Sequence, residues 1–292
     1  MSSANQKQQA APGGDVLVLG DGRRVGVSVF GAREGFPVIG LHGMPGSRLM
    51  YATVAQAAAR RGIRLIAVDR PGYGRSDRRA QGTLLGYAGD VAGIADVIGL
   101  GRFAVLGTSG GGSYALACAA RLGSRLTRVG VVSGIGPLRT PGSLSGMAPV
   151  NRWIFRLARV SPALVGVVLP RLVRRSLAQL QAHVAAGTSP SPSIPPGVLP
   201  LVVADLAEAI RQGGAGIAFD AGNLWRPWGF PFTQITVPAH LWHGDADNLA
   251  PVAFGQLIAG AIPGCEATFY PGEGHAEPLT RHADEIMAEM AG

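Results

Sequence analysis

A serine surrounded by glycines is the first feature of this chain that could carry chemistry. Ser109 lies at the centre of Gly107-Thr108-Ser109-Gly110-Gly111, between the apolar run Phe103–Leu106 and the helix-like run Ser113–Leu122. The chain has 44 glycines, so the pentapeptide alone is weak evidence and its flanking elements carry the argument. A serine on a sharp turn between a strand and a helix is exposed for attack on a carbonyl carbon. The alternative is a phosphate loop, but the segment lacks the lysine and the glycine spacing of such loops.

His275 is the histidine best placed to act as the base that a serine nucleophile needs. It ends the segment Gly272-Glu273-Gly274-His275, which follows a predicted strand at Glu266–Tyr270. The other histidines lie in a different motif, in helical segments or beside a strand. We therefore predict that His275 accepts the proton of Ser109.

Two aspartates follow a late predicted strand, and one of them should orient the ring of His275. Asp247 lies four residues before Pro251, which begins a predicted helix, and this spacing favours a loop position above the strand end. Asp245 lies closer to the strand and is expected to brace the turn. The predicted catalytic residues are thus Ser109, Asp247 and His275.

Backbone N–H groups near Ser109 should stabilise the negative charge that develops on the substrate oxygen. Gly110 directly follows the nucleophile and supplies one predicted donor. Met44 supplies the second, from the loop after the apolar run Pro37–Leu41. His42 in the same loop is expected to form a hydrogen bond within the loop and to take no part in the reaction.

The elements that must position these residues alternate between short apolar runs and helix-like segments. This alternation is typical of a parallel sheet that is covered by helices on both faces. The predicted strands are Pro37–Leu41, Leu65–Val68, Phe103–Leu106, Val129–Val132, Ala239–Trp242 and Glu266–Tyr270. The predicted helices are Leu49–Arg61, Leu84–Ile98, Ser113–Leu122, Pro251–Ala261 and His275–Met290. Before them, Val16–Leu19 and Val25–Phe30 flank a turn and predict a β-hairpin.

The alternation stops near Ile135 and resumes about one hundred residues later. We predict a helical cap at residues 137–232, inserted into an α/β core formed by residues 15–136 and 233–292. A polar, flexible tail is predicted at residues 1–14. The predicted cap helices are Asn151–Arg159, Ala163–Leu180 and Val198–Gln212.

Composition restricts the classes of partner and compartment. The net charge is +8, but the arginines are spread along the chain without a nucleic-acid motif, so we predict no nucleic-acid partner. Two cysteines cannot form a disulfide scaffold, and no apolar run is long enough to span a membrane, which favours the cytoplasm. No metal or organic cofactor and no stable membrane association are expected. The alternative is a lipid-surface protein that uses Ala163–Arg175 as an amphipathic basic helix.

Taken together, the ordered motifs resemble those of the α/β-hydrolase superfamily. The matching segments are His42-Gly43-x-Pro45-Gly46, Asp69-Arg70-Pro71-Gly72-Tyr73-Gly74-x-Ser76-Asp77, Gly107-x-Ser109-x-Gly111, His243-Gly244-x-x-Asp247 and Gly274-His275. The chain order serine, aspartate, histidine is also that of the superfamily. The resemblance implies an eight-stranded, mostly parallel sheet flanked by helices. It also implies a helical cap after the sixth strand and a pocket between core and cap.

A serine at the nucleophile position argues against the dehalogenases and epoxide hydrolases of this superfamily, which use aspartate. We predict a carboxylesterase-like serine hydrolase that cleaves a small-to-medium carboxylic ester or lactone through an acyl-enzyme. A carbon–carbon bond hydrolase acting on a dienoic ketone acid is an alternative, with Arg152 or Arg174 holding its carboxylate. A proline-iminopeptidase-like aminopeptidase would need acidic cap residues, of which the cap has few: Asp205, Glu208 and Asp220. A ligand-binding module without activity is the non-enzymatic alternative.

Overall fold

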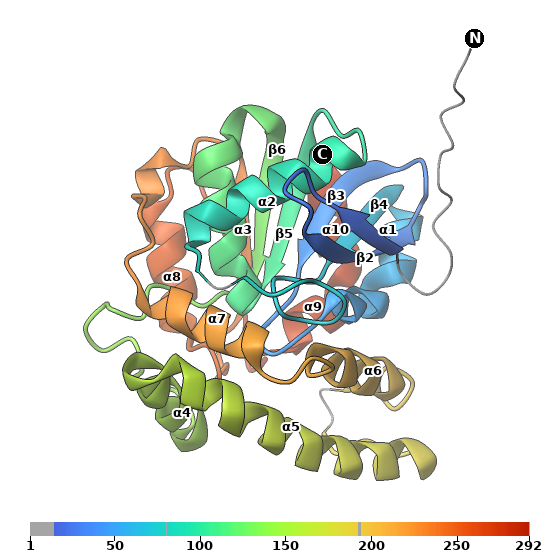
Figure 1. Ribbon diagram of the computed structural model, residues 1–292, viewed down its shortest axis with the longest axis vertical. Helices are drawn as coiled ribbons and strands as arrows, with labels where there is room; N and C mark the ends of the chain where they lie inside the picture. The colour runs from blue at the N-terminus through green and yellow to red at the C-terminus, as the bar shows by residue number, and fades with distance from the viewer. Residues whose placement is uncertain (1–14, 80, 192–193, 292) are drawn as a thin grey trace.

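An eight-stranded sheet forms the centre of the computed structural model, which describes residues 15–79, 81–191 and 194–291 (Figure 1). The predicted tail at residues 1–14 lies outside the described residues. The strand order is β1-β2-β4-β3-β5-β6-β7-β8, and only the two pairs made by β2 are antiparallel. The strands are β1 (Asp15–Val18), β2 (Arg24–Gly31), β3 (Phe36–Leu41), β4 (Ile63–Val68), β5 (Phe103–Thr108), β6 (Leu126–Val132), β7 (Ala239–Gly244) and β8 (Glu266–Tyr270).

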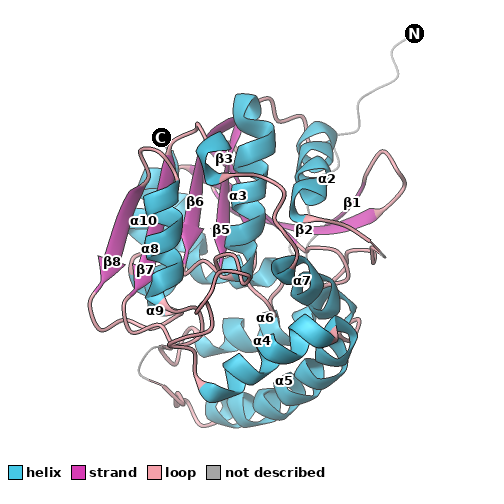
Figure 2. Ribbon diagram, turned by 90° about the vertical axis from the view of Figure 1, so that its left-hand side faces the viewer, coloured by secondary structure: helices cyan, strands magenta, loops and turns pink. Residues whose placement is uncertain are grey.

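Helices cover both faces of the sheet, which explains why the central strands are apolar along their whole length (Figure 2). Helices α2 (Leu84–Val97), α3 (Gly110–Leu122) and α8 (Val252–Ala261) pack on one face. Helices α1 (Ala55–Arg60) and α10 (Ala283–Ala291) pack on the other. The remaining core helices are η1 (Arg48–Val54), η2 (Gly123–Arg125), η3 (Phe232–Gln234) and α9 (Glu277–Arg281).

Two predicted helices are divided in the structure. The segment predicted as a helix at Leu49–Arg61 begins as the 3-10 helix η1 and continues as α1. The closing helix predicted at His275–Met290 consists of α9 and α10, which are separated at His282, and His275 itself lies in the loop before α9. Because α9 begins only at Glu277, His275 lies outside regular structure, in the loop after the edge strand β8.

Among the described residues, four α-helices lie between β6 and β7 and form a layer below the core, at the carboxyl ends of the parallel strands (Figure 1). They are α4 (Pro149–Val160), α5 (Pro162–Ala185), α6 (Leu199–Ala209) and α7 (Ala215–Trp225). The eight-stranded sheet and the helical insertion after the sixth strand are as predicted. Helix α7 was not predicted, because it begins among the glycines at positions 213, 214 and 216, which disfavour helix. Among the described residues, no helix is long and apolar enough to cross a membrane.

A buried ion pair joins α7 to the core. The Arg70 side chain follows β4 and is fully buried, and its Nη2 lies 2.5 Å from an oxygen of Asp220 on α7. The hydroxyls of Tyr73 and Tyr114 donate to the same carboxylate, at 2.8 and 2.6 Å. The guanidinium of Arg70 also donates to the carbonyl oxygens of His42 and Gly43, in the loop after β3. The loop after β3 is thereby tied to the cap.

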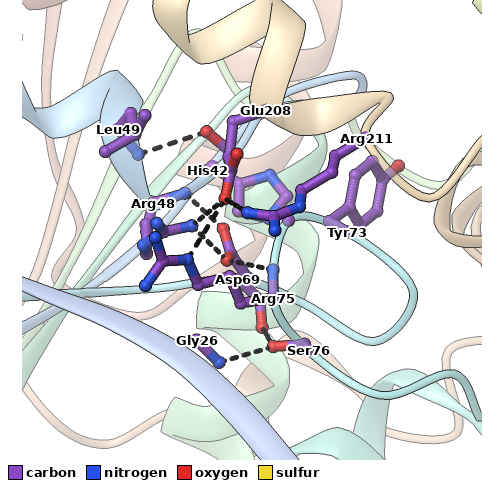
Figure 3. A network of polar contacts seen from close by, with 12 residues as sticks. Gly26, His42, Arg48, Leu49, Asp69, Tyr73, Arg75, Ser76, Glu208 and Arg211 are labelled. Atoms are coloured by element: carbon purple, nitrogen blue, oxygen red, sulfur yellow. Dashed lines mark hydrogen bonds and ion pairs between the residues drawn. The ribbon is translucent and has the colours of Figure 1, made fainter. Parts of the chain in front are cut away.

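A second buried ion pair joins α6 to the core (Figure 3). Nη1 of Arg48 lies 2.7 Å from Asp69 and 2.7 Å from Glu208 on α6. Asp69 also accepts from the backbone N–H of Arg75, at 2.9 Å, and its carbonyl accepts from the Ser76 hydroxyl, at 2.6 Å. These contacts hold the segment after β4 against the cap.

We expect Asp220→Asn to destabilise the fold strongly, because it leaves the buried guanidinium of Arg70 without a counter-charge. Removing one partner of a buried ion pair costs about 3–5 kcal/mol. Asp284→Asn is the matched control, since Asp284 pairs with Arg60 and both side chains are about half exposed; such pairs contribute about 0–1 kcal/mol. Urea denaturation measures both free energies of unfolding. Equal losses in the two variants would contradict the role of the Arg70–Asp220 pair.

Candidate active site

Ser109 lies on a strained turn between β5 and α3. Its φ of 54° is in the region that non-glycine residues rarely occupy. The backbone of the turn is held because the Ser109 N–H donates to the carbonyl of Val132, at 2.8 Å. The flanking glycines are required by space: a Cβ on Gly111 would lie 2.1 Å from the carbonyl oxygen of Leu41, and one on Gly107 would lie 2.4 Å from that of Gly111. The sequence therefore builds a sharp strand–turn–helix that presents Ser109.

His275 and Asp247 are in direct contact. Nδ1 of His275 lies 2.6 Å from Oδ2 of Asp247, and Oδ1 of Asp247 accepts from the backbone N–H groups of Leu249 and Ala250, each at 2.8 Å. Burial raises the pKa of Asp247, but hydrogen bonds from His243 and His275 outweigh burial and hold that pKa well below its usual value. An ionised carboxylate only accepts, so Nδ1 of His275 carries the proton at this contact.

A second histidine that the sequence did not single out also contacts this carboxylate. His243, at the end of β7, is fully buried, and its Nε2 lies 3.4 Å from Oδ2 of Asp247. The same nitrogen lies 2.7 Å from the carbonyl oxygen of Ala250, and it carries the proton because a carbonyl only accepts. His243 therefore contacts the loop of Asp247 at two points, the Asp247 carboxylate and the Ala250 carbonyl. The only signal in the sequence was its place in the segment His243-Gly244-x-x-Asp247.

The loop of His275 is held by a serine at the end of β6. Ser133 has a φ of 48°, and its hydroxyl donates to the carbonyl oxygen of His275, at 2.8 Å. Asp245, expected to brace the turn, accepts from the N–H of Gly272, at 2.7 Å. The three loops after β6, β7 and β8 are therefore fixed to one another around His275.

The loop after β3, which contains Gly43 and Met44, also lies beside Ser109. A Cβ on Gly43 would lie 3.8 Å from the Ser109 hydroxyl, and one on Gly110 would lie 3.7 Å from the backbone nitrogen of Met44. The structure therefore brings the backbones of Met44 and Gly110, the two expected donors, together beside Ser109.

His42 forms hydrogen bonds within this loop region, as expected from the sequence. Its Nε2 accepts from the backbone N–H of Arg70, at 3.0 Å, and its Nδ1 lies 2.8 Å from the carbonyl oxygen of Gly43. Burial, followed by the nearby charge of Arg70, lowers the pKa of His42 well below its usual value. His42 is therefore a neutral, structural part of the loop.

Ser109 and His275 line the same cavity, which has a volume of about 290 Å³ and lies between the core and α6. Most of its lining is apolar, from Met44, Pro45, Met50, Ile194, Val198, Leu201, Val202, Leu206, Leu249, Ala276 and Leu279. Neither Arg152 nor Arg174, the residues considered for holding a substrate carboxylate, is among its lining residues. Within the described ranges, no group of three or more His, Cys, Asp or Glu side chains could hold a metal ion.

Asp205 contributes a carboxylate to the lining of this cavity, a position that nothing in the sequence indicated. Its Oδ1 accepts from both the N–H and the hydroxyl of Ser47, each at 2.7 Å, so α6 holds the end of the loop that contains Met44. Burial raises the pKa of Asp205 to about 7, against the opposing effect of the Ser47 hydrogen bonds. This contact could not be found by motif, because the two residues are 158 positions apart.

A profile of the alpha/beta hydrolase fold matches residues 37–279, which is most of the chain. The chain belongs to the alpha/beta hydrolase fold family. This alpha/beta hydrolase is 26% identical to a non-heme haloperoxidase of Rhodococcus erythropolis, over 88% of this chain and 91% of the relative. Its fold is similar to that of an esterase from a Rhodococcus species (TM-score 0.70, 24% identity, 96% and 98% covered). An enol-lactonase from Burkholderia xenovorans is similar at the level of fold (TM-score 0.67, 20% identity, 94% and 97% covered).

We expect Asp205→Asn to remove a pH dependence of stability from this alpha/beta hydrolase. Since the folded-state pKa of about 7 lies above the unfolded value of 3.8, folding takes up a proton at intermediate pH. The stability that this provides is full below pH ~4 and is lost as the pH rises to ~7. The Tm of the wild type should therefore fall relative to that of Asp205→Asn over this window, by on the order of 5 °C.

Thermal unfolding at half-unit pH steps, followed by circular dichroism, measures this difference. A difference in Tm that stays constant from pH 4.5 to pH 8 would show that Asp205 has an ordinary pKa. The asparagine keeps an oxygen that accepts from Ser47, so the variant tests the charge and retains the hydrogen bonds.

Proposed function

We propose that this protein is a serine hydrolase that cleaves small-to-medium carboxylic esters or lactones. The observation that carries the proposal is the apolar cavity that Ser109 shares with His275, whose ring is in turn hydrogen-bonded to the ionised Asp247. A hydroxyl, an oriented imidazole and a buried carboxylate are the groups needed for acyl transfer through a serine ester.

In the proposed first step, the Ser109 oxygen bonds to the carbonyl carbon while its proton passes to Nε2 of His275. This nitrogen is the free acceptor because Nδ1 carries the proton that bonds to Asp247. The carbonyl oxygen becomes an oxyanion and accepts from the N–H groups of Gly110 and Met44. Its collapse breaks the bond to the alcohol oxygen, which leaves with the proton held by His275.

In the second step, water attacks the acyl-enzyme. The water oxygen bonds to the acyl carbon while one proton of the water passes to His275. The oxyanion of this second tetrahedral intermediate accepts from the same two N–H groups. Collapse returns the proton to Ser109 and releases the carboxylic acid. A lactone follows the same path, but its alcohol and acid remain parts of one product molecule.

The lining of the cavity supports a neutral, apolar acyl group. A volume of about 290 Å³ is at the small end of the range for ligand pockets. The described lining contains no arginine, so the carboxylate of a dienoic ketone acid would be buried there without a counter-charge, which disfavours the carbon–carbon bond hydrolase.

The acidic residues of the cap also argue against an aminopeptidase. Glu208 and Asp220 are bound by Arg48 and Arg70, and Asp205 is committed to Ser47, so none of the three is free to hold a substrate amine. The fold similarity to an esterase and to an enol-lactonase is consistent with an ester or lactone substrate.

A second candidate activity is favoured by the similarity to the non-heme haloperoxidase of Rhodococcus erythropolis. Hydrogen peroxide is a nucleophile that could replace water in the second step. The bond from the acyl carbon to Ser109 would break, and the products would be a peroxy acid and the free serine. Peroxide-dependent formation of peroxy acid from an ester, absent in Ser109→Ala, would establish this activity beside ester hydrolysis.

We expect Ser109→Ala to lower kcat for p-nitrophenyl butyrate by on the order of 10⁴-fold or more, because alanine has no hydroxyl to attack the carbonyl carbon. Ser176→Ala, at an exposed position on α5, is the matched control and should keep wild-type turnover. Circular dichroism establishes that both variants are folded. Wild-type turnover in Ser109→Ala would exclude Ser109 as the nucleophile.

We expect Asp247→Asn to lower kcat by about 10³–10⁴-fold, because an amide no longer fixes the tautomer of His275. Asp245→Asn changes the same charge two positions away, in the same loop, and should lower kcat far less. KM should change little in either variant, since neither side chain lines the cavity. Similar losses in both variants would mean that the loop is needed only for folding.

A further inference from the structure

The positive charge of this protein is concentrated in one part of the cap. Residues 137–204 contain seven arginines and no aspartate or glutamate. The rest of the chain carries nineteen basic and eighteen acidic residues, so nearly all of the net charge of +8 belongs to this segment. Helices α4 and α5 supply six of the seven arginines, and the loop before α4 supplies Arg139.

Four of these arginines surround a cavity with a volume of about 780 Å³, here called the arginine cavity. Arg139 lines it from the loop after β6, and Arg152, Arg156 and Arg159 line it from successive turns of α4. Their spacing of four and three residues places the three helical arginines on one face of α4. Trp225, at the end of α7, completes the wall.

These four guanidinium groups have no counter-charge within the described part of the chain. None of them forms an ion pair there, whereas the buried guanidiniums of Arg48 and Arg70 each face a carboxylate. Among the residues that the structure describes, the lining of the arginine cavity contains no acidic residue. Like charges in a shared cavity repel one another, so an anion between them would relieve a cost that the folded chain carries.

Two residues in the lining of the arginine cavity, Arg152 and Trp225, have features suited to binding a ligand. The Nε atom of Arg152 is buried and has no hydrogen-bond partner among the described residues, although its Nη2 donates to the carbonyl of Met147, at 3.0 Å. The guanidinium of Arg159 lies 5.7 Å from the ring centre of Trp225, whose indole N–H donates to the carbonyl of Phe155 and so fixes the ring. The cavity thus offers an unused buried donor beside a fixed aromatic wall.

We propose that the arginine cavity binds an anion that carries several phosphate charges. Planar guanidinium groups pair with phosphate oxygens through two parallel hydrogen bonds, which suits arginine better than lysine for this task. The volume exceeds that of one phosphate, and four cations match a di- or triphosphate better than a single carboxylate. This site is separate from the cavity of Ser109, with which it shares no lining residue.

A phosphate of this kind could belong to a soluble molecule or to a lipid headgroup. Exposed apolar side chains occur on the same two helices, among them Trp153 and Val160 on α4 and Leu164 on α5. Both sources present the same chemistry to the four arginines, so the experiment carries one arm for each.

The first arm measures binding of inorganic pyrophosphate by isothermal titration calorimetry. The test variant is Arg139→Gln with Arg156→Gln, since both side chains are exposed and their replacement should leave the fold intact. The matched control is Arg174→Gln with Arg175→Gln, which removes the same charge from α5 outside the cavity. We expect saturable binding to the wild type, a loss of about tenfold in affinity in the test variant, and less than about twofold in the control.

The second arm measures co-sedimentation with phosphatidylcholine vesicles, with and without one-third phosphatidylglycerol, using the same proteins. Binding of pyrophosphate alone assigns the cavity to a soluble phosphate. Binding to the anionic vesicles that is lost only in the test variant assigns it to a headgroup. Absence of saturable binding in both arms, or equal losses in the test and control variants, would overturn the proposal. Circular dichroism and p-nitrophenyl butyrate hydrolysis establish that both variants are folded.

Discussion

The contact between Arg70 and Asp220 is the interaction on which the site depends most. The guanidinium pairs with the Asp220 carboxylate of α7 and also donates to the carbonyl oxygens of His42 and Gly43, directly before Met44. A buried ion pair adds little net stability, because both charges lose their water. Its effect is to specify one position of the cap and one conformation of the loop beside Ser109.

The sequence was informative wherever a local rule governs the backbone. The strand, turn and helix around Ser109 follow from hydrophobic patterning and from glycines that steric contact requires, and the order of Asp247 and His275 follows the same rules. The sheet and the insertion after its sixth strand were predictable for that reason. The predicted extents of the core and cap, and the catalytic roles, remain predictions.

Most of the unpredicted features depend on contacts between distant parts of the chain; the contact of His243 with Asp247, four positions away, is an exception. Helix α7 has weak local propensity and is stabilised by packing, and the partner of its Asp220 is 150 positions away. Asp205 and its partner Ser47 are likewise far apart in the sequence, at 158 positions. His243 looked like an ordinary strand residue, although it contacts Asp247. The arginines are spread along the chain, but acidic residues are absent from residues 137–204, and this concentrates the net charge there. The sequence does not show which of these arginines share a cavity.

The anchoring of α6 and α7 has a consequence for how a substrate reaches Ser109. Lifting these helices from the core as a rigid lid would separate Glu208 from Arg48 and leave the buried guanidinium of Arg70 without Asp220, so this movement is costly. Helices α4 and α5 contain no acidic residue and, within the described part of the chain, form no such pair with the core. Admission of substrate is therefore expected to rely on side chains along the cavity, such as Ile194 and Val198, and the rate of that local opening would set how fast the acyl group arrives.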